Sequence, residues 1–198
     1  MILALSVLAL QTPPAPAQDA GLCEAHVFPT DHVQGFTRLG NYGLLTDLTA
    51  GGAVPEAEML AQIKADSQFA IVSRLFGQEG RLAGFRFVEH REPVDAKLSF
   101  KQKARLAGSQ QPCYVEIVVN YLSFSDSALT KAKVGVHFVT RDFRNRPDKP
   151  AIRMLGGAAL LAPYVGERTS PGAEPDIDFV GAYTEAFEAA IKRFWKPG

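Results

Sequence analysis

The side chains best suited to acid–base or metal chemistry are the four histidines, His26, His32, His90 and His137. His26 and His90 each lie in a short stretch of alternating polarity, which predicts two strands that we expect to be neighbours in a sheet. With His32 they form a candidate zinc-like set, and with nearby acids they are the residues that a small hydrolase or metalloenzyme would use. Their spacing is not diagnostic of a metal site, so hydrogen-bonded structural histidines are the preferred interpretation.

A second group of reactive side chains is the serine cluster Ser123, Ser125 and Ser127, which lies beside Asp126. Serine and aspartate are ordinary residues at a turn between strands, and the sequence places no base next to these hydroxyls. The chain contains no Gly-x-Ser-x-Gly, Cys-x-x-Cys or His-Glu-x-x-His motif, no phosphate-binding loop and no dinucleotide fingerprint. We therefore predict no catalytic residue, no cofactor and no metal ligand, and an enzymatic function is the less favoured interpretation.

The most site-like polar residues lie between Cys113 and Phe143, a stretch that alternates in polarity on both sides of a short polar break. The alternation predicts an antiparallel hairpin. Its apolar face carries Val115, Ile117, Val119, Tyr121, Val134, Val136 and Phe138. Its opposite face carries Glu116, Asn120, His137 and Arg141. Because a two-residue period places one row on a core, we expect the polar row to face either water or a partner.

The other elements must hold this hairpin. The sequence predicts strands at Glu24–Pro29, Gly84–His90 and Ala151–Leu161, and helices at Pro55–Phe76, Ala96–Ala107 and from Pro175 onward. The strand at Ala151–Leu161 is expected to loosen at Gly156-Gly157. The order β-α-β-α-β-β-β-α predicts an α+β (mixed α/β) fold, with a single mixed sheet of about five strands and helices mainly on one face. The apolar stripe of the last helix, including Phe187, is expected to cover the hairpin.

Thr30–Val54 is predicted to be a long connection, and it is unusually apolar for a loop. Its larger apolar residues include Phe36, Tyr42, Leu44 and Leu45. Two interpretations are open: the segment folds over the core as a cover, or it forms a surface that docks a protein or lipid partner.

The amino terminus predicts export. Ile2 to Leu10 is almost uniformly apolar, and Ala15-Pro-Ala17 offers small residues where a signal peptidase cuts. Residues 1–17 are therefore predicted to be a cleaved signal peptide and residues 18–198 a single globular domain, in the periplasm or secreted. The two cysteines, Cys23 and Cys113, each begin a strand-like run. If these strands are parallel neighbours, an oxidising compartment would join the cysteines in a disulfide.

The charge balance argues against several partner classes. Lys plus Arg and Asp plus Glu number 21 each, so the net charge is zero and nothing global favours nucleic acid. No apolar run approaches the roughly 20 residues needed for a transmembrane helix. A protein or envelope component is therefore the expected partner.

Several stretches resemble a group of exported bacterial envelope domains. These stretches are Ile71-Val-Ser-Arg-Leu-Phe76 followed by Gly84-Phe-Arg-Phe-Val88, and the short helix before Cys113-Tyr-Val-Glu-Ile-Val-Val119. The pattern over residues 23–195 is similar to that of the TolB amino-terminal domain and of the CsgG-like and LPP20-type lipoproteins. The resemblance implies a non-catalytic role in envelope assembly or secretion, and it carries over no functional residue. The lipidated cysteine of several members is not in the expected place.

The leading hypothesis is therefore an exported, non-enzymatic envelope domain that binds a protein or another envelope component. One alternative is a small periplasmic hydrolase or metalloenzyme that uses His26 and His90. Another is a binder of small apolar ligands, held between the sheet and its helices.

Overall fold

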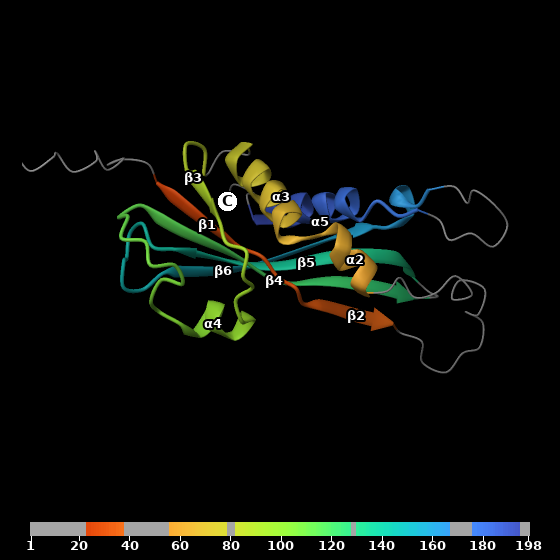
Figure 1. The fold of residues 1–198 in the computed structure, drawn as a ribbon, viewed down its shortest axis with the longest axis horizontal. Helices are drawn as coiled ribbons and strands as arrows, with labels where there is room; N and C mark the ends of the chain where they lie inside the picture. The colour runs from red at the N-terminus through yellow and green to blue at the C-terminus, as the bar shows by residue number, and fades with distance from the viewer. Residues whose placement is uncertain (1–22, 38–55, 79–81, 128–129, 167–175, 195–198) are drawn as a thin grey trace, which may run out of the picture.

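The computed structural model describes residues 23–37, 56–78, 82–127, 130–166 and 176–194 (Figure 1). The predicted signal peptide and the residues Tyr42, Leu44 and Leu45 lie outside these ranges. No helix within the ranges is long and apolar enough to cross a membrane.

Within the described residues, six strands form one mixed sheet in the order β3-β1-β4-β5-β6, with β2 pairing the second half of β4. The strands are β1 (Glu24–Phe28), β2 (Val33–Thr37), β3 (Arg86–Glu89), β4 (Tyr114–Ser127), β5 (Thr130–Asp142) and β6 (Ala151–Leu160). β1 is parallel to β3 and to β4, whereas β4, β5 and β6 are antiparallel. The predicted α+β class with a single mixed sheet is confirmed.

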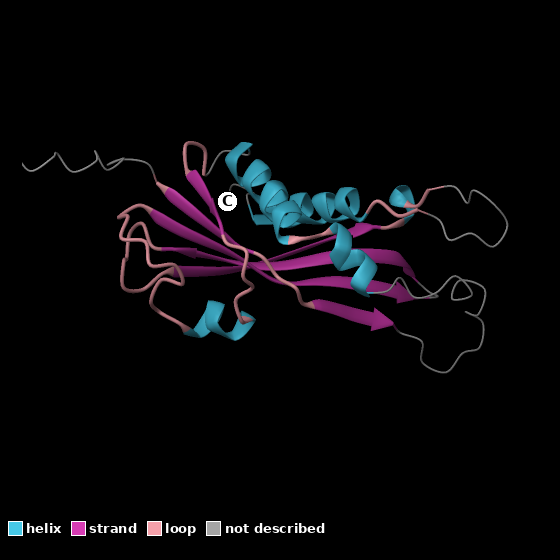
Figure 2. Ribbon diagram, in the orientation of Figure 1, coloured by secondary structure: helices cyan, strands magenta, loops and turns pink. Residues whose placement is uncertain are grey.

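Helices cover both faces of the sheet, but unequally (Figure 2). The larger helices lie together on one face: α2 (Glu56–Gln62), α3 (Ala65–Gln78) and α5 (Phe179–Phe194). The short helix α4 (Ala96–Lys101) lies on the opposite face, which we call the outer face. A single 3₁₀ turn, η1 (Ala162–Tyr164), leads away from β6.

The core lies between the sheet and the larger helices. α5 begins where Asp178 Oδ1 accepts the Gly181 N–H at 2.8 Å, which satisfies one of the free donors of the first turn. Phe187 of α5 packs on Phe138 of β5 with ring centroids 5.6 Å apart. The predicted packing of the last helix on the apolar face of the hairpin is therefore confirmed.

Gly157 explains how closely α5 approaches the sheet. A Cβ at this position would lie 2.0 Å from the Ala186 carbonyl oxygen and 2.5 Å from the Ala190 nitrogen. Because a real Cβ does not approach backbone so closely, only glycine fits here. The prediction that the strand loosens at Gly156-Gly157 is wrong, since β6 pairs with β5 without interruption from Ala151 to Leu160.

Other differences from the predicted elements are local. β2 lies within the segment that was predicted to be a loop, and Phe36 belongs to it. The predicted helix Pro55–Phe76 is two helices, and α4 ends at Lys101 rather than Ala107. A register shift between Val119 and Tyr121 also changes one face assignment: Tyr121 lies on the outer face, where its ring stacks on His137.

Candidate functional site

The predicted disulfide is present and fixes one end of the sheet. Cys23 and Cys113 are bonded across 90 residues of sequence, with their Cα atoms 4.6 Å apart. The register explains the pairing, because Glu24 of β1 lies beside Tyr114 of parallel β4, so the preceding cysteines meet at one edge. A disulfide is compatible with an exported protein.

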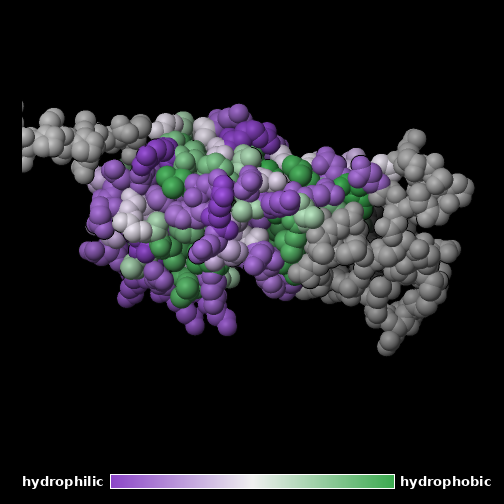
Figure 3. Space-filling view, in the orientation of Figure 1, coloured by the Kyte–Doolittle hydropathy of each residue, from purple (hydrophilic) through white to green (hydrophobic). Residues whose placement is uncertain are grey.

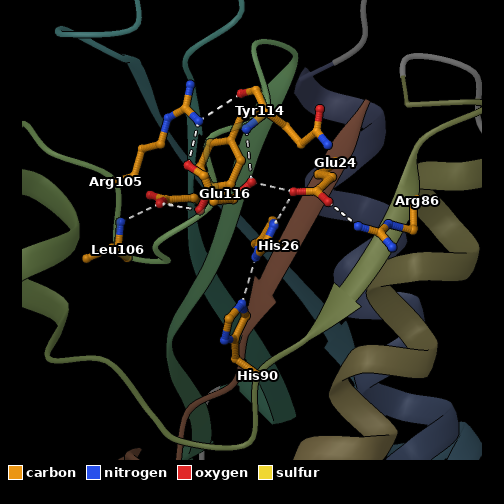
Figure 4. Close-up of polar contacts among 10 residues, drawn as sticks. Glu24, His26, Arg86, His90, Arg105, Leu106, Tyr114 and Glu116 are labelled. Carbon is orange, nitrogen blue, oxygen red and sulfur yellow. Dashed lines mark hydrogen bonds and ion pairs between the residues drawn. The ribbon is translucent and has the colours of Figure 1, made fainter. Parts of the chain in front are cut away.

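Next to the disulfide, three side chains form a polar chain, Glu24–His26–His90, in which Glu24 and His26 are buried and His90 is half-buried (Figure 4). Glu24 Oε2 lies 3.0 Å from His26 Nε2, and His26 Nδ1 lies 2.8 Å from His90 Nε2. The predicted proximity of His26 and His90 is confirmed, since β1 and β3 are neighbours and His90 follows β3 directly. Two further partners hold Glu24, the half-exposed Arg86 guanidinium and the Ser109 hydroxyl.

The electrostatics of this chain keep Glu24 ionised. Burial alone would raise its pKa, but hydrogen bonds from Ser109, His26 and Arg86 outweigh burial and lower the pKa to about 2. Burial lowers the pKa of His90, and the neighbouring His26 lowers it further. The arrangement therefore favours a carboxylate at one end and a neutral imidazole at the other.

His90 faces a cleft of about 450 Å³ that it shares with residues including Arg91, Glu92 and Leu106. Its ring also stacks on Phe28, with centroids 4.1 Å apart. Chemically, the chain can orient His90 and exchange one proton with a molecule in the cleft. His32 does not join this cluster: it is exposed, and its carbonyl accepts the Leu122 N–H. Within the described ranges, no group of three or more His, Cys, Asp or Glu side chains is placed to hold a metal ion.

A second polar cluster is buried on the outer face. The Arg141 guanidinium forms an ion pair with Glu116, and both side chains are completely buried. Arg141 also donates to the carbonyl oxygens of Gln102 and Ala104, the latter at 2.9 Å. The Glu116 carboxylate accepts the Leu106 N–H at 2.5 Å, together with the Tyr114 hydroxyl at 2.8 Å.

These contacts fasten the segment after α4 across the sheet. Arg105 continues the attachment, because its guanidinium lies 4.5 Å from the centre of the Tyr114 ring and donates to the carbonyls of Ser109 and Gln111. The expectation that the polar row faces water or a partner is therefore wrong for Glu116 and Arg141. Both side chains instead hold the segment after α4, Gln102–Leu106, against the outer face, and we call this segment the cover. Asn120 is also nearly buried, in contact with Ser99 of α4, and His137 alone of the row is exposed.

Beside this cover lies an apolar groove of about 480 Å³ between α4 and β6. We call it the outer groove; it is lined by Ala96, Phe100, Asn120, Tyr121, His137, Phe138, Met154, Leu155 and Gly156. The Tyr121 and His137 rings form its floor, stacked with centroids 4.4 Å apart. Gly156 makes room for this floor, since a Cβ there would lie 3.0 Å from the His137 ring.

The walls of the outer groove expose large apolar side chains. Met154 is 72% exposed and Phe100 is 38% exposed. Leu98, Ile152 and Leu160 add exposed apolar surface on α4 and β6. In Figure 3, hydrophobic residues reach the surface at the lower side of the view, in the region of α4, within a largely hydrophilic face. Exposed apolar side chains that gather around a groove are typical of an interaction site.

The sequence predicted part of this site. Asn120 and His137 were expected to be on a partner-facing row, and both line the outer groove. Phe100 and Met154 were not predicted as site residues, and in β6 the sequence drew attention to Gly156-Gly157 instead. The signal that points to Met154 is the uncharged alternate row of β6, with Ile152 and Leu160 as its other large members. Ser123 and Ser125 lie within β4 and pair with β2 and β5, not at a turn.

Comparisons with known proteins identify no family for this chain. No protein-family model matches the sequence, and a search of the curated proteins finds no match. Among solved structures, the chain is similar to the hypothetical protein CT253 from Chlamydia trachomatis, at 14% identity and a TM-score of 0.33. That similarity covers 87% of this chain and 90% of the other.

Proposed function

We propose that this protein is an exported, non-enzymatic domain that binds an uncharged, apolar segment of another envelope protein in the outer groove. The observation that carries the proposal is the exposed apolar lining of that groove, with Phe100 on one wall and Met154 on the other. Aromatic and methionine side chains are enriched at protein interfaces, and charged side chains are depleted from their centres. The groove follows this pattern, because none of its lining residues is Asp, Glu, Lys or Arg.

A protein segment suits the groove better than a small apolar ligand does. Small-molecule sites enclose most of their ligand. Here the row of β6 that lines the groove with Met154 and Gly156 also carries Ile152 and Leu160, whose side chains are exposed beyond the lining. A partner chain can cover the groove and these side chains together, which a ligand of groove size cannot.

The floor of the groove also favours an uncharged protein segment as the partner. The His137 ring is stacked on Tyr121, and this partial desolvation lowers its pKa, so the imidazole is neutral near pH 7 and does not attract an anionic group. The side-chain oxygen of Asn120 accepts a hydrogen bond from the Ser99 hydroxyl, and Asn120 also lines the groove. Its side chain therefore offers one uncharged polar group to a backbone amide of the partner. An uncharged segment therefore matches both the walls and the floor.

The Glu24–His26–His90 chain is assigned a structural role in this proposal. Its hydrogen bonds join β1 to the residue that follows β3, at the edge that the disulfide also fixes. His90 is engaged on Nε2 by His26 and on one ring face by Phe28, as a packing residue would be.

The proposal is tested by placing a photo-crosslinking amino acid at Met154, in the envelope of the cells that make the protein. We expect an adduct whose cross-linked peptide is uncharged and apolar, and whose yield falls at least about tenfold when Phe100→Asp is added. Val180→Asp is the matched control, because Val180 is also 38% exposed but lies on α5. Equal adduct yields with and without Phe100→Asp, in a folded protein, would refute the proposal.

A further inference from the structure

The edge strand β6 carries a second, independent feature. β5 and β6 pair in unbroken register from Lys133–Leu160 to Asp142–Ala151, and the Leu161 N–H just beyond donates to the Ala132 carbonyl at 2.9 Å. In an antiparallel ladder, the N–H and C=O of alternate residues point to the same neighbour. The backbone groups of the intervening residues therefore point away from β5: Ile152, Met154, Gly156, Ala158 and Leu160.

These backbone groups have no strand partner among the described residues, because β6 is the last strand of the sheet path. The same residues carry the side chains of the outer face, and every one of them is apolar or glycine. Ile152, Met154 and Leu160 are 39%, 72% and 41% exposed. Edge strands of monomeric proteins are usually protected by charges, prolines, bulges or a covering element.

β6 has little of that protection. It contains no proline, its pairing shows no bulge, and its single charged residue is Arg153, whose backbone groups point to β5. α5 covers the other face of β6 at Gly157, so it leaves the outer side chains exposed. Unpaired backbone donors and acceptors next to an apolar row are the features of a strand that accepts another extended chain.

We propose that the partner segment binds by adding to β6 as a further β-strand, with its alternate side chains on the outer face beside the groove. This inference rests on the proposed function and names the conformation and chemistry of the partner. The segment is extended, uncharged and apolar at every second residue. Backbone hydrogen bonds to β6 supply affinity, and the groove supplies side-chain selectivity.

The geometry also selects one side chain of the segment. Gly156 has no side chain in the outer row of β6, between Met154 and Ala158, and the edge of the His137 ring lies over it. An added strand would run about 4.8 Å from β6, so a large side chain opposite Gly156 can lean across it toward His137. An aromatic ring at that position would meet the edge of the His137 ring, beside the Tyr121–His137 stack.

The probe is a phage-displayed library of random ten-residue peptides, selected on the purified protein. We expect the enriched peptides to be apolar at alternate positions, with an aromatic residue at one of them. N-methylation of the synthetic peptides, one residue at a time, should weaken binding at least about tenfold at alternate residues only, because only these N–H groups face β6. Enrichment of no peptide over background, or N-methyl effects without alternation, would overturn strand addition.

Two protein variants separate this inference from the proposed function. Ala158→Pro removes an N–H that faces the free edge and is not used within the sheet, and Ala158→Lys adds an edge charge if the proline variant fails to fold. We expect either variant to reduce peptide binding at least about tenfold, and Ala158→Val, the matched control, to retain it. If the Ala158 variants bind like the wild type while Phe100→Asp does not, the groove stands and strand addition is wrong. If neither change affects binding by folded protein, both proposals fail.

Discussion

Replacing Arg141 with methionine tests whether the buried ion pair holds the cover on the outer face. The methionine would fill much of the space of the arginine stem but would leave the Glu116 carboxylate buried without its counter-charge. Removing one partner of a buried pair costs about 3–5 kcal/mol. Each kcal/mol shifts the melting temperature by about 2–4 °C in a protein of this size. We therefore expect Arg141→Met to lower the melting temperature by roughly 10 °C.

The same substitution should release the segment after α4. Arg141 bonds the carbonyl oxygens of Gln102 and Ala104, and trypsin sites lie beside them at Lys101, Lys103 and Arg105. We expect limited trypsin digestion to cut this segment several times faster in Arg141→Met than in the wild type. Urea unfolding would supply the free energy, and mass spectrometry would locate the cleavage.

The double variant Arg141→Met/Glu116→Gln tests whether the unpaired charge of Glu116 causes the loss of stability. Glu116→Gln keeps an acceptor for the Leu106 N–H and the Tyr114 hydroxyl but removes the charge. In the Arg141→Met background it should recover about 2 kcal/mol, because no unpaired charge is then buried. A single-variant cost below about 1 kcal/mol, with unchanged trypsin cleavage, would refute the conclusion that this pair holds the cover.

Three further predictions follow from the other buried features. Replacing both Cys23 and Cys113 with alanine should cost about 2–4 kcal/mol in urea unfolding, and the wild type should gain two alkylated thiols only after reduction. The pKa of Glu24 falls from 4.5 to about 2 in the folded state, so its stabilisation is complete above pH 4.5 and is lost as the pH falls toward 2. That loss should be about 2–3 kcal/mol, measured as the pH dependence of urea unfolding, and it should be absent in Glu24→Gln. Gly157→Ala should destabilise by about 3 kcal/mol or more, because its Cβ meets the backbone of α5, whereas Gly108→Ala, with open space around it, should change stability by less than about 1 kcal/mol.

The sequence predicts well those elements whose pattern is long and whose partner is local. The hairpin and the last helix have clear periods of two and of 3.6, and both are present. The disulfide followed from the same patterns, because Cys23 and Cys113 each precede a strand. β2 was missed because five residues with a central glycine, Gly35, carry too weak an alternation.

The cover on the outer face was not predictable from pattern. Alternation correctly placed Glu116 and Arg141 on the face opposite the core, but it does not show what lies above that face. The cover is held mainly by backbone carbonyls and an N–H between Gln102 and Leu106, and no side-chain period reports such contacts. The bulge that turns Tyr121 into the groove is equally invisible, since it shifts the register by a single residue.

The buried pair and the outer groove are linked through α4. Arg141 does not line the groove, but it holds Gln102, the residue that directly follows α4, two positions after Phe100 on the groove wall. If the groove binds a partner segment, Arg141→Met should therefore weaken peptide binding by displacing that wall, and Glu116→Gln should partly restore it. Ser73→Ala on α3, which lies on the opposite face, should leave affinity unchanged. Full peptide affinity in Arg141→Met, despite faster trypsin cleavage after α4, would show that β6 and the groove floor suffice for binding.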